Sequence, residues 1–275
     1  MSEILLRLRG GLGNQLFQYC AGAYYAKQYD SDLIIDNTNV NKHVDKTRRC
    51  WLEKIDYVST FGFTNVRWQS HSSLGYSRIL NRIYPKHAFI DENSLKTITK
   101  MPKKIAVFDW FHNKSYAEAL CFEEGSKDGP YRKLHLKDSL LLDNASFGRE
   151  RAALHMRLGD FKLTNWGVLP SDWYLARVKN LREMGIEDID CFSDDIEESK
   201  EIIEKWDLDI RFGFPEERGY LLPHKLLFLL TRYPIFISSN STLSWWASFF
   251  NQNQNPTILC NWRSELRLDH WSYFE

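Results

Sequence analysis

The 275-residue sequence predicts an α/β protein with two domains, each built around a parallel sheet. The chain opens with a strand, a glycine-containing loop, a helix and a second strand, the order of a parallel pair joined by a right-handed crossover. After about residue 150, short apolar runs again alternate with segments of helical spacing. The polar stretch 143–146 precedes this second series, so we expect one domain of residues 1–145 and another of residues 146–275.

The first domain is clearest at its start. Residues 4–8 predict a strand, residues 14–29 predict a helix from their apolar spacing, and residues 33–35 predict a second strand that ends on Asp36. Residues 37–105 interleave aromatic and basic side chains without a clear period. No element is predicted there.

The second domain predicts strands and helices in regular alternation, which is typical of a doubly wound sheet. The predicted strands are residues 152–156, 189–192, 210–212, 235–237 and 257–260, and the predicted helices are residues 172–184, 196–206, 223–231 and 242–250. We expect Gly185 to close the first of these helices.

Composition limits the partners and the compartment. The 36 basic and 36 acidic residues balance, so net charge gives no argument for nucleic acid or for an anionic membrane, and any anion must be held locally. The five cysteines show no C-x-x-C spacing, which argues against a disulfide framework and a zinc cluster. No signal peptide and no membrane-spanning stretch are visible. We therefore expect a cytoplasmic protein without a membrane anchor.

Polar clusters occur at the carboxyl ends of four predicted strands, where ligands of open parallel sheets bind. The clusters contain Gly10, Gly11, Gly13, Asn14 and Gln15; His155, Arg157 and Asp160; Ser193 and Asp194; and Asn240, Ser241 and Thr242. Their repeated position predicts a ligand site.

Arg157 is the first candidate for binding a diphosphate. A guanidinium can grip two oxygens at once, and its charge can stabilise the charge that a leaving nucleoside diphosphate develops. The alternative is a structural ion pair with Asp160. His155, two residues earlier on the same strand face, is a candidate for contact with the base or ribose, or else a core histidine.

Residues 238–242 predict an anion site at the start of a helix. Backbone N–H groups there, with the hydroxyls of Ser241 and Thr242, would bind phosphate. Ordinary capping of the helix by either hydroxyl is the alternative, and the two roles are compatible.

The first loop also suggests a dinucleotide-binding turn, because Gly11 and Gly13 follow a strand and Asp36 lies downstream. Leu16 argues against that reading, since it occupies the third glycine position of the fingerprint.

Four motifs occur in order along nearly the whole chain. They are Gly-Gly-Leu-Gly-Asn-Gln-Leu-Phe-Gln-Tyr at residues 10–19, His-x-Arg-x-Gly-Asp at 155–160, Phe-Ser-Asp-Asp at 192–195 and Asn-Ser-Thr-x-Ser-Trp-Trp at 240–246. In these motifs the sequence resembles the bacterial α-1,2-fucosyltransferases. It departs from them at Leu158, where many relatives carry a second arginine.

The resemblance implies a GT-B-like architecture of two Rossmann-type domains with the site in the cleft between them. Domain 1–145 would take the acceptor and domain 146–275 the nucleotide sugar. The implied enzyme is a galactoside α-1,2-fucosyltransferase. It would transfer fucose from GDP-fucose to a hydroxyl of an acceptor glycan, with inversion and without a metal or cofactor.

The resemblance also implies roles for individual residues. It places Arg157 on the diphosphate, and Asn14 and Gln15 facing the reaction centre beside the loop glycines. The implied donor-binding residues are His155, Asp160, Ser193, Asp194, Asn240, Ser241 and Thr242. We expect Asn14 to act on turnover; the alternative is that it only caps the first helix.

Two Asp-x-Asp segments have the spacing that holds a divalent ion in many glycosyltransferases, residues 188–190 and 207–209. Both lie at strand ends away from the polar clusters. We expect solvated turns, with Arg157 and a helix N-terminus doing the electrostatic work of a metal ion.

Other interpretations stay open. The enzyme could use another nucleotide sugar, or the chain could bind a nucleotide sugar or glycan without turnover. The expected acceptor is a glycan of an O-antigen or another polysaccharide, free or lipid-linked, with peripheral contact at the inner face of the membrane. Asp36 and His43 are candidates for the general base because they follow a strand end near the first loop.

Overall fold

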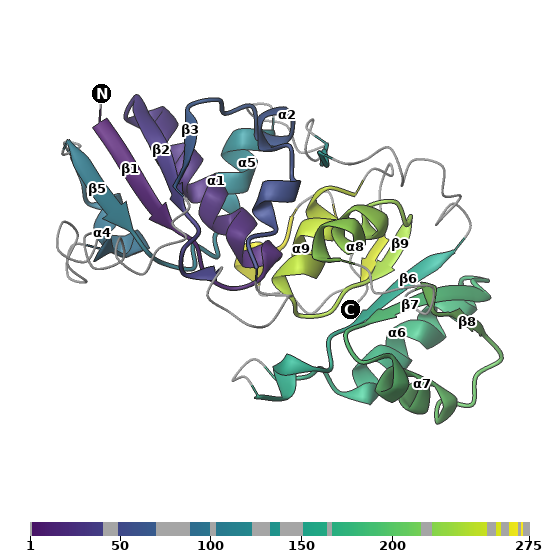
Figure 1. The fold of residues 1–275 in the computed structure, drawn as a ribbon. Coiled ribbons are helices and arrows are strands. Elements are labelled where there is room, and N and C mark those ends of the chain that lie inside the picture. Colours follow the sequence, from purple (N-terminus) through teal and green to yellow (C-terminus); the bar gives the residue numbers. More distant parts are fainter. Residues whose placement is uncertain are drawn as a thin grey trace. The chain divides into compact units, whose positions relative to one another are not determined.

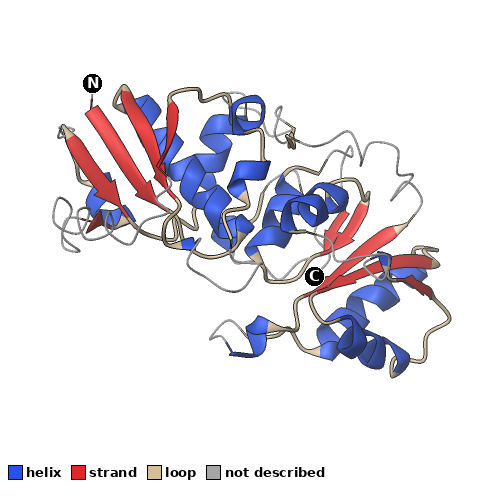
Figure 2. Cartoon of the chain, viewed as in Figure 1, coloured by secondary structure: helices blue, strands red, loops and turns tan. Residues whose placement is uncertain are grey.

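The computed structural model describes residues 2–40, 49–69, 89–99, 103–122, 133–137, 151–163, 167–215, 222–251, 257–259, 264–268 and 271. The chain divides into two compact units, Met1–Ser126 with Pro130–Lys137, and Lys127–Gly129 with Asp138–Glu275. Each unit contains one five-stranded sheet, and helices cover it (Figures 1 and 2). The α/β class with parallel sheets is confirmed, while the predicted boundary after residue 145 lies outside the described residues.

The sheet of the first unit has the order β3-β2-β1-β5-β4, and all its strand pairs are parallel. Its strands are β1 (Ser2–Arg7), β2 (Ser31–Asp36), β3 (Val66–Gln69), β4 (Phe89–Ile90) and β5 (Lys104–Val107). Its helices are α1 (Leu12–Gln28), the 3₁₀ helix η3 (Leu52–Lys54), α2 (Tyr57–Phe61), α4 (Glu92–Lys96) and α5 (Lys114–Cys121). The strand order changes direction at the central β1, between β2 and β5, and ligands of such sheets bind at this point.

The sheet of the second unit has the order β10-β9-β6-β7-β8, again wholly parallel. Its strands are β6 (Ala152–Met156), β7 (Asp188–Ser193), β8 (Arg211–Gly213), β9 (Ile235–Ile237) and β10 (Thr257–Leu259). Its helices are η6 (Asp160–Leu163), α6 (Ser171–Glu183), α7 (Ile196–Glu204), α8 (Pro223–Leu230), α9 (Thr242–Phe249) and η8 (Ser264–Leu266). Here the order changes direction between β6 and β9.

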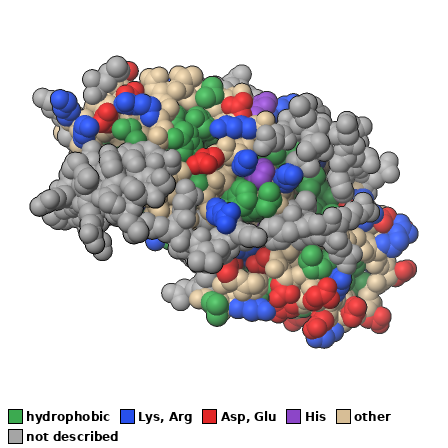
Figure 3. Space-filling model, in the orientation of Figure 1, with side chains coloured by type: hydrophobic (Ala, Val, Ile, Leu, Met, Phe, Trp, Pro, Cys, Tyr) green, Lys and Arg blue, Asp and Glu red, His purple; other side chains and the backbone are tan. Residues whose placement is uncertain are grey.

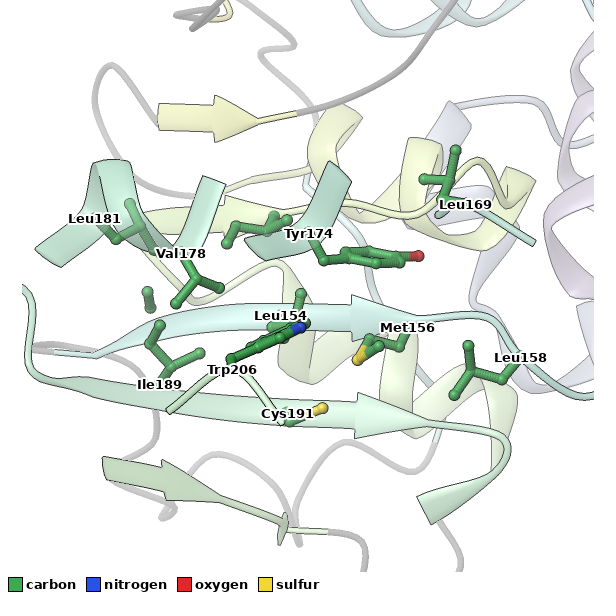
Figure 4. Close-up of a cluster of buried hydrophobic side chains, with 12 residues drawn as sticks. Leu154, Met156, Leu158, Leu169, Tyr174, Val178, Leu181, Ile189, Cys191 and Trp206 are labelled. Atoms are coloured by element: carbon green, nitrogen blue, oxygen red, sulfur yellow. The ribbon is translucent and has the colours of Figure 1, made fainter. Parts of the chain in front are cut away.

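The core of the second unit explains why its strands form reliably. All five residues of β6 are buried, as expected of a parallel strand covered on both faces. Figure 4 shows Leu154 and Ile189 of neighbouring strands packed with Val178 and Leu181 of α6. This packed layer is a rigid base for the residues that follow the strands.

The elements predicted for the second domain are confirmed. The strands at 152–156 and 235–237 match residue for residue, and the helix predicted at 172–184 is α6. Gly185 has a φ of +82° and its N–H bonds to the carbonyl of Arg182, so it ends α6 as expected.

The stretch 37–105 contains elements that the sequence did not predict, namely η3, α2, β3, β4 and α4. Each has five residues or fewer, too few to show a hydrophobic period. Strand β5 and helix α5, which follow, were also not predicted. Among the described helices, none combines the length and the apolar character of a membrane span.

Candidate active site

Two predicted polar clusters meet at the carboxyl edge of the second sheet. His155 is on β6 and Ser244 is on α9, and the His155 Nδ1 lies 2.5 Å from the Ser244 Oγ. Ser239, which follows β9, contacts both, with its Oγ 2.9 Å from Ser244 Oγ and 3.4 Å from His155 Nδ1. The clusters after β6 and β9 therefore form one site at the point where the strand order changes direction.

Arg157 lies at this edge between two carboxylates. Its Nη2 is 2.8 Å from Asp160 Oδ1 and its Nη1 is 3.1 Å from Asp194 Oδ2. The side chain is 23% exposed, so the guanidinium is partly open to a ligand. The ion pair with Asp160 that the sequence suggested is present, and it is compatible with a role toward phosphate because it fixes the guanidinium in place.

Asp194 holds the loop that carries Arg157. Its Oδ1 accepts hydrogen bonds from the backbone N–H groups of Leu158 (2.8 Å) and Gly159 (3.1 Å). A Cβ atom on Gly159 would come within 2.6 Å of the Asp194 Oδ2, so this close approach requires glycine. Asp194 thus acts as a support for Arg157, and Leu158 is 1% exposed in the core.

Ser193 is also used locally. Its Oγ donates to the carbonyl of Asp195 over 2.9 Å and accepts from the N–H of the same residue over 3.0 Å. The Ser193 side chain therefore stabilises the turn after β7. The sequence did not predict this structural role.

His155 is buried, with 2% exposure. Burial, reinforced by the charge of Arg157 and opposed by Asp194, lowers the pKa of His155 to about 4. The imidazole is therefore neutral at pH 7. Its burial and its contacts with Ser239 and Ser244 fit the alternative of a satisfied core histidine.

The start of α9 faces the same edge. Ser241 is the N-cap, and its Oγ accepts from the N–H of Leu243 at 3.2 Å, so the capping alternative is observed. Thr242 is the first residue of the helix, and Asn240 donates from Nδ2 to the carbonyl of Gly167 at 3.1 Å. No acidic residue occupies the first turn, which leaves the helix N-terminus electropositive.

Tyr174 at this edge had no role predicted from the sequence, and Ser238 lies in the predicted run 238–242 but had no role of its own. Burial raises the pKa of Tyr174, whose hydroxyl lies against the backbone of Arg157. Figure 4 shows that hydroxyl pointing toward the carboxyl end of β6, beyond which Leu158 lies. The Ser238 Oγ is buried without a hydrogen-bond partner among the described residues.

In the first unit, the loop after β1 has a backbone conformation that requires glycine. Gly10 has a φ of +72°, and a Cβ there would come within 2.5 Å of Asn14 Nδ2 and 3.0 Å of the Trp110 ring. Gly11 is the N-cap of α1 and makes no side-chain capping bond. Asn14 is the third residue of α1, so the alternative that it caps this helix is wrong.

Asn14 instead pairs with a residue that the sequence did not point out. Its Oδ1 lies 2.9 Å from the Nε2 of His112, whose ring also meets Phe17 edge-on. His112 follows β5, and Arg9 stacks on Trp110 of the same segment at 3.6 Å. Phe111 between them has a φ of +53°, a strained conformation that a packed environment must hold. Recognising β5 would have placed this segment at a strand end.

Gln15 differs from expectation. It is 0% exposed, and its Nε2 donates to the carbonyls of Gly10 (2.9 Å) and Arg49 (2.8 Å). Its Oε1 accepts from the N–H groups of Trp51 and Leu52, each at 3.1 Å. The whole amide is engaged, so Gln15 supports the loop and does not present its side chain to a substrate.

Asp36 is unsuited to either role considered for it. The side chain is 0% exposed, its Oδ2 accepts from Arg7 Nε at 2.8 Å, and its Oδ1 accepts from the hydroxyl of Thr38 at 2.6 Å. A carboxylate held this way is a structural ion pair, which argues against a general base and a ribose ligand. His43 lies outside the described residues.

The first Asp-x-Asp segment is not a solvated turn, contrary to expectation. Asp188 and Asp190 are on β7, and Arg151 bridges them at 3.1 and 2.8 Å. Asp190 also accepts from the Tyr233 hydroxyl at 2.8 Å. Both carboxylates are thus neutralised within the sheet. The segment 207–209 lies in the exposed connection between α7 and β8.

Acidic side chains gather elsewhere on the second unit. Figure 3 shows them in the lower part of the view, over α7, whose sequence contributes Glu197, Glu198, Glu201 and Glu204. A surface rich in carboxylates does not favour phosphate binding. In the described part of the chain, no group of three or more His, Cys, Asp and Glu side chains could hold a metal ion.

Comparison with known proteins connects these features to an enzyme class. No protein-family model matches the chain. It is 23% identical to the O-antigen biosynthesis glycosyltransferase WbnK of Escherichia coli over 315 residues, covering 96% of this chain and 98% of WbnK. It is 24% identical to an alpha-1,2-colitosyltransferase of Escherichia coli over 272 residues, covering 90% and 88%.

Two solved structures share the fold. POFUT1 in complex with GDP gives a TM-score of 0.56 at 13% identity, covering 94% of this chain and 98% of POFUT1. The fucosyltransferase NodZ from Bradyrhizobium gives 0.53 at 12% identity, covering 90% and 92%. The resemblance seen in the four motifs is thereby confirmed: the chain is a glycosyltransferase with the GT-B fold of the fucosyltransferases.

Proposed function

We propose that this glycosyltransferase transfers fucose from GDP-fucose to a hydroxyl of galactose in an acceptor glycan, forming an α-1,2 linkage with inversion and without a metal ion. The observation that carries the proposal is Arg157, which two carboxylates fix at the edge of the second sheet where α9 also begins, at the switch point of the strand order. The donor is supported by a structural neighbour, the alpha-1,6-fucosyltransferase NodZ, which was soaked with GDP-fucose. The linkage is supported by the relative named as an alpha-1,2-colitosyltransferase.

Arg157 would bind the diphosphate of the donor. Asp160 and Asp194 each engage one end of the guanidinium, and its further N–H groups can bond phosphate oxygens. Because the two carboxylates together carry one charge more than the guanidinium, the N–H groups at the start of α9 would supply further positive potential for the phosphates. Ser241 and Thr242 place that helix start, and Ser238 adds a buried hydroxyl nearby.

The reaction is a single displacement. The acceptor oxygen forms a bond to the anomeric carbon as the bond from that carbon to the β-phosphate oxygen breaks, and the electron pair leaves with GDP. The acceptor hydroxyl gives up its proton to a base. Attack from the face opposite GDP inverts the anomeric carbon. Arg157 and the α9 N-terminus stabilise the charge that grows on the diphosphate, which is the task a divalent ion performs in metal-dependent enzymes.

Asn14 would position the acceptor hydroxyl or the glycosidic oxygen. His112 orients the Asn14 amide, and the glycine at position 10 lets the backbone pass close to a sugar. Gln15 keeps this loop in shape through four bonds to backbone groups. A pre-shaped loop loses little entropy when the acceptor binds.

The acceptor and the compartment are part of the proposal. An O-antigen or other polysaccharide glycan as the acceptor fits the name of WbnK, and we propose that this glycan is carried on a lipid. The buried thiols of Cys20, Cys50, Cys121 and Cys191 fit the reducing cytoplasm, at the inner face of the membrane.

A donor screen followed by linkage analysis tests this function. GDP-fucose, GDP-colitose, GDP-mannose and UDP-galactose are each incubated without acceptor and the release of nucleoside diphosphate is measured. The match to a colitosyltransferase makes GDP-colitose the specific competitor to GDP-fucose. Preference for GDP-fucose and an α-1,2 product support the proposal. Donor binding without any turnover, with or without acceptor, would instead identify a binding module.

A further inference from the structure

We propose that the first unit carries a saccharide subsite specific for a sugar with a negative charge. The subsite is the pocket of about 370 Å³ lined by Glu53, Lys54, Trp68 and Lys137. The inference rests on the proposed function, because such a sugar would be a further residue of the acceptor glycan.

The pocket lies at the same edge of the sheet as the first loop. Trp68 is on β3, next to its last residue. Glu53 and Lys54 belong to η3, whose first backbone N–H the buried amide of Gln15 holds in place. Because Gln15 also bonds to the carbonyl of Gly10, one side chain supports both the loop and the pocket wall. A glycan bound at the loop can therefore extend toward the pocket.

The indole of Trp68 is fixed as a platform. Its Nε1–H donates to the Tyr57 hydroxyl over 3.0 Å, and the two ring centroids are 6.0 Å apart. The ammonium of Lys137 lies 5.4 Å from the centre of the Tyr57 ring, which restrains the lysine. The apolar C–H face of a pyranose packs well on such a ring without ordering it first.

The charges of the pocket select the kind of sugar. Glu53 is oriented by Asn37, whose Nδ2 donates to its Oε1 over 2.6 Å, and a carboxylate in that position accepts bonds from sugar hydroxyls. Lys54 and Lys137 add two ammonium groups, so among the described lining residues the basic side chains outnumber the one acidic side chain. With the two ammonium groups, a neutral sugar can form only hydrogen bonds through its hydroxyls, without an ion pair. A pyranose bearing a carboxylate or a phosphate uses all four side chains.

Binding of glucuronic acid and of glucose 6-phosphate, with glucose as the neutral reference, tests the proposal. The probe is the indole N–H resonance of Trp68 in the ¹⁵N-labelled full chain, identified by its absence from Trp68→Phe. We expect the charged sugars to shift it at concentrations about tenfold below those needed with glucose. Raising the salt from about 50 to about 500 mM should weaken the two charged sugars only. A preference between them shows whether the natural group is a carboxylate or a phosphate, and either one supports the proposal.

Variants complete the test. Lys54→Gln with Lys137→Gln should raise the dissociation constant of the charged sugars about tenfold. Lys103→Gln, which changes another exposed lysine of the same unit, should leave it unchanged. GDP binding, measured by calorimetry, reports on the proposed donor site separately. Equal shifts with all three sugars, no shift with any of them, or an equal loss in Lys103→Gln would overturn the subsite and leave the donor proposal standing.

Discussion

Arg157→Ala is the substitution that most directly tests the proposed chemistry. The variant removes a guanidinium that two carboxylates hold at the edge of the second sheet. Loss of one preorganised charge contact at a developing diphosphate costs about 3 kcal/mol or more, which lowers kcat about a hundred- to a thousandfold. Arg157→Lys should restore little of the turnover, because an ammonium group cannot bond Asp160, Asp194 and a phosphate with the planar geometry of a guanidinium.

The fold should survive the change. Asp160 and Asp194 lose their partner, but their side chains are 32% and 18% exposed, so water compensates in part. We expect a loss of about 1 to 2 kcal/mol in the free energy of unfolding. Asp194 also keeps its two bonds to backbone N–H groups, which hold the loop.

The chain provides a matched control. Arg151 also bridges two carboxylates of β7, at the other end of the strand, and its side chain is 34% exposed. Arg151→Ala should lower the melting temperature without changing kcat. Initial rates with GDP-fucose and calorimetric titration with GDP are measured on both variants. Turnover within threefold of the parent in folded Arg157→Ala, or an equal loss in Arg151→Ala, would refute the role of Arg157.

Three further predictions concern the loop, the metal and pH. Asn14→Ala should lower kcat about ten- to a thousandfold while GDP binding changes little. His112→Ala should also lower kcat, because it releases the Asn14 amide. A variant of either residue with a lower melting temperature but normal turnover would show that the pair is only a structural contact. Activity should persist in excess EDTA, and complete loss restored by magnesium or manganese would contradict metal independence. The free energy of unfolding should rise as the pH increases from about 4 to 6.5, because over this range the unfolded state binds a proton at His155 that the native state excludes. The shift corresponds to about 3 kcal/mol, and chemical denaturation should show a flatter profile in His155→Asn.

The second unit could be predicted closely because its elements carry their own pattern. Strands such as β6 are continuous apolar runs, and the helices between them are long enough to show a period. The position of its candidate site could be predicted from the parallel topology, because the polar clusters that follow β6 and β9 lie close together when these strands are neighbours. The roles of Ser193 and Asp194 could not be predicted from the sequence. The sequence does not distinguish a polar side chain that bonds to the backbone from one that binds a ligand.

The first unit resisted prediction for a different reason. The partner of Asn14 follows β5, a strand of four residues whose place beside β1 depends on contacts far away in sequence. Because β5 was not predicted, the sequence could not place His112 and Trp110 at the carboxyl edge of the sheet. Gln15 was misassigned because an amide in a glycine-rich loop suggests a ligand contact, whereas here it bonds backbone groups of residues 49–52.

The position of β5 bears on how the enzyme is made. During synthesis β1 gains its neighbour β2 within about thirty residues, but its other neighbour arrives only with residues 104–107. Until then β1 has an unpaired edge, and its apolar residues Ile4, Leu5 and Leu6 lack part of their cover. The loop that would handle the acceptor is completed in the same late step, since Asn14 and His112 are 98 residues apart. A nascent chain that stalls before residue 104 thus exposes an unpaired strand edge that is prone to aggregation. Pairing of β5 with β1 covers this edge in the same step that completes the loop needed for catalysis.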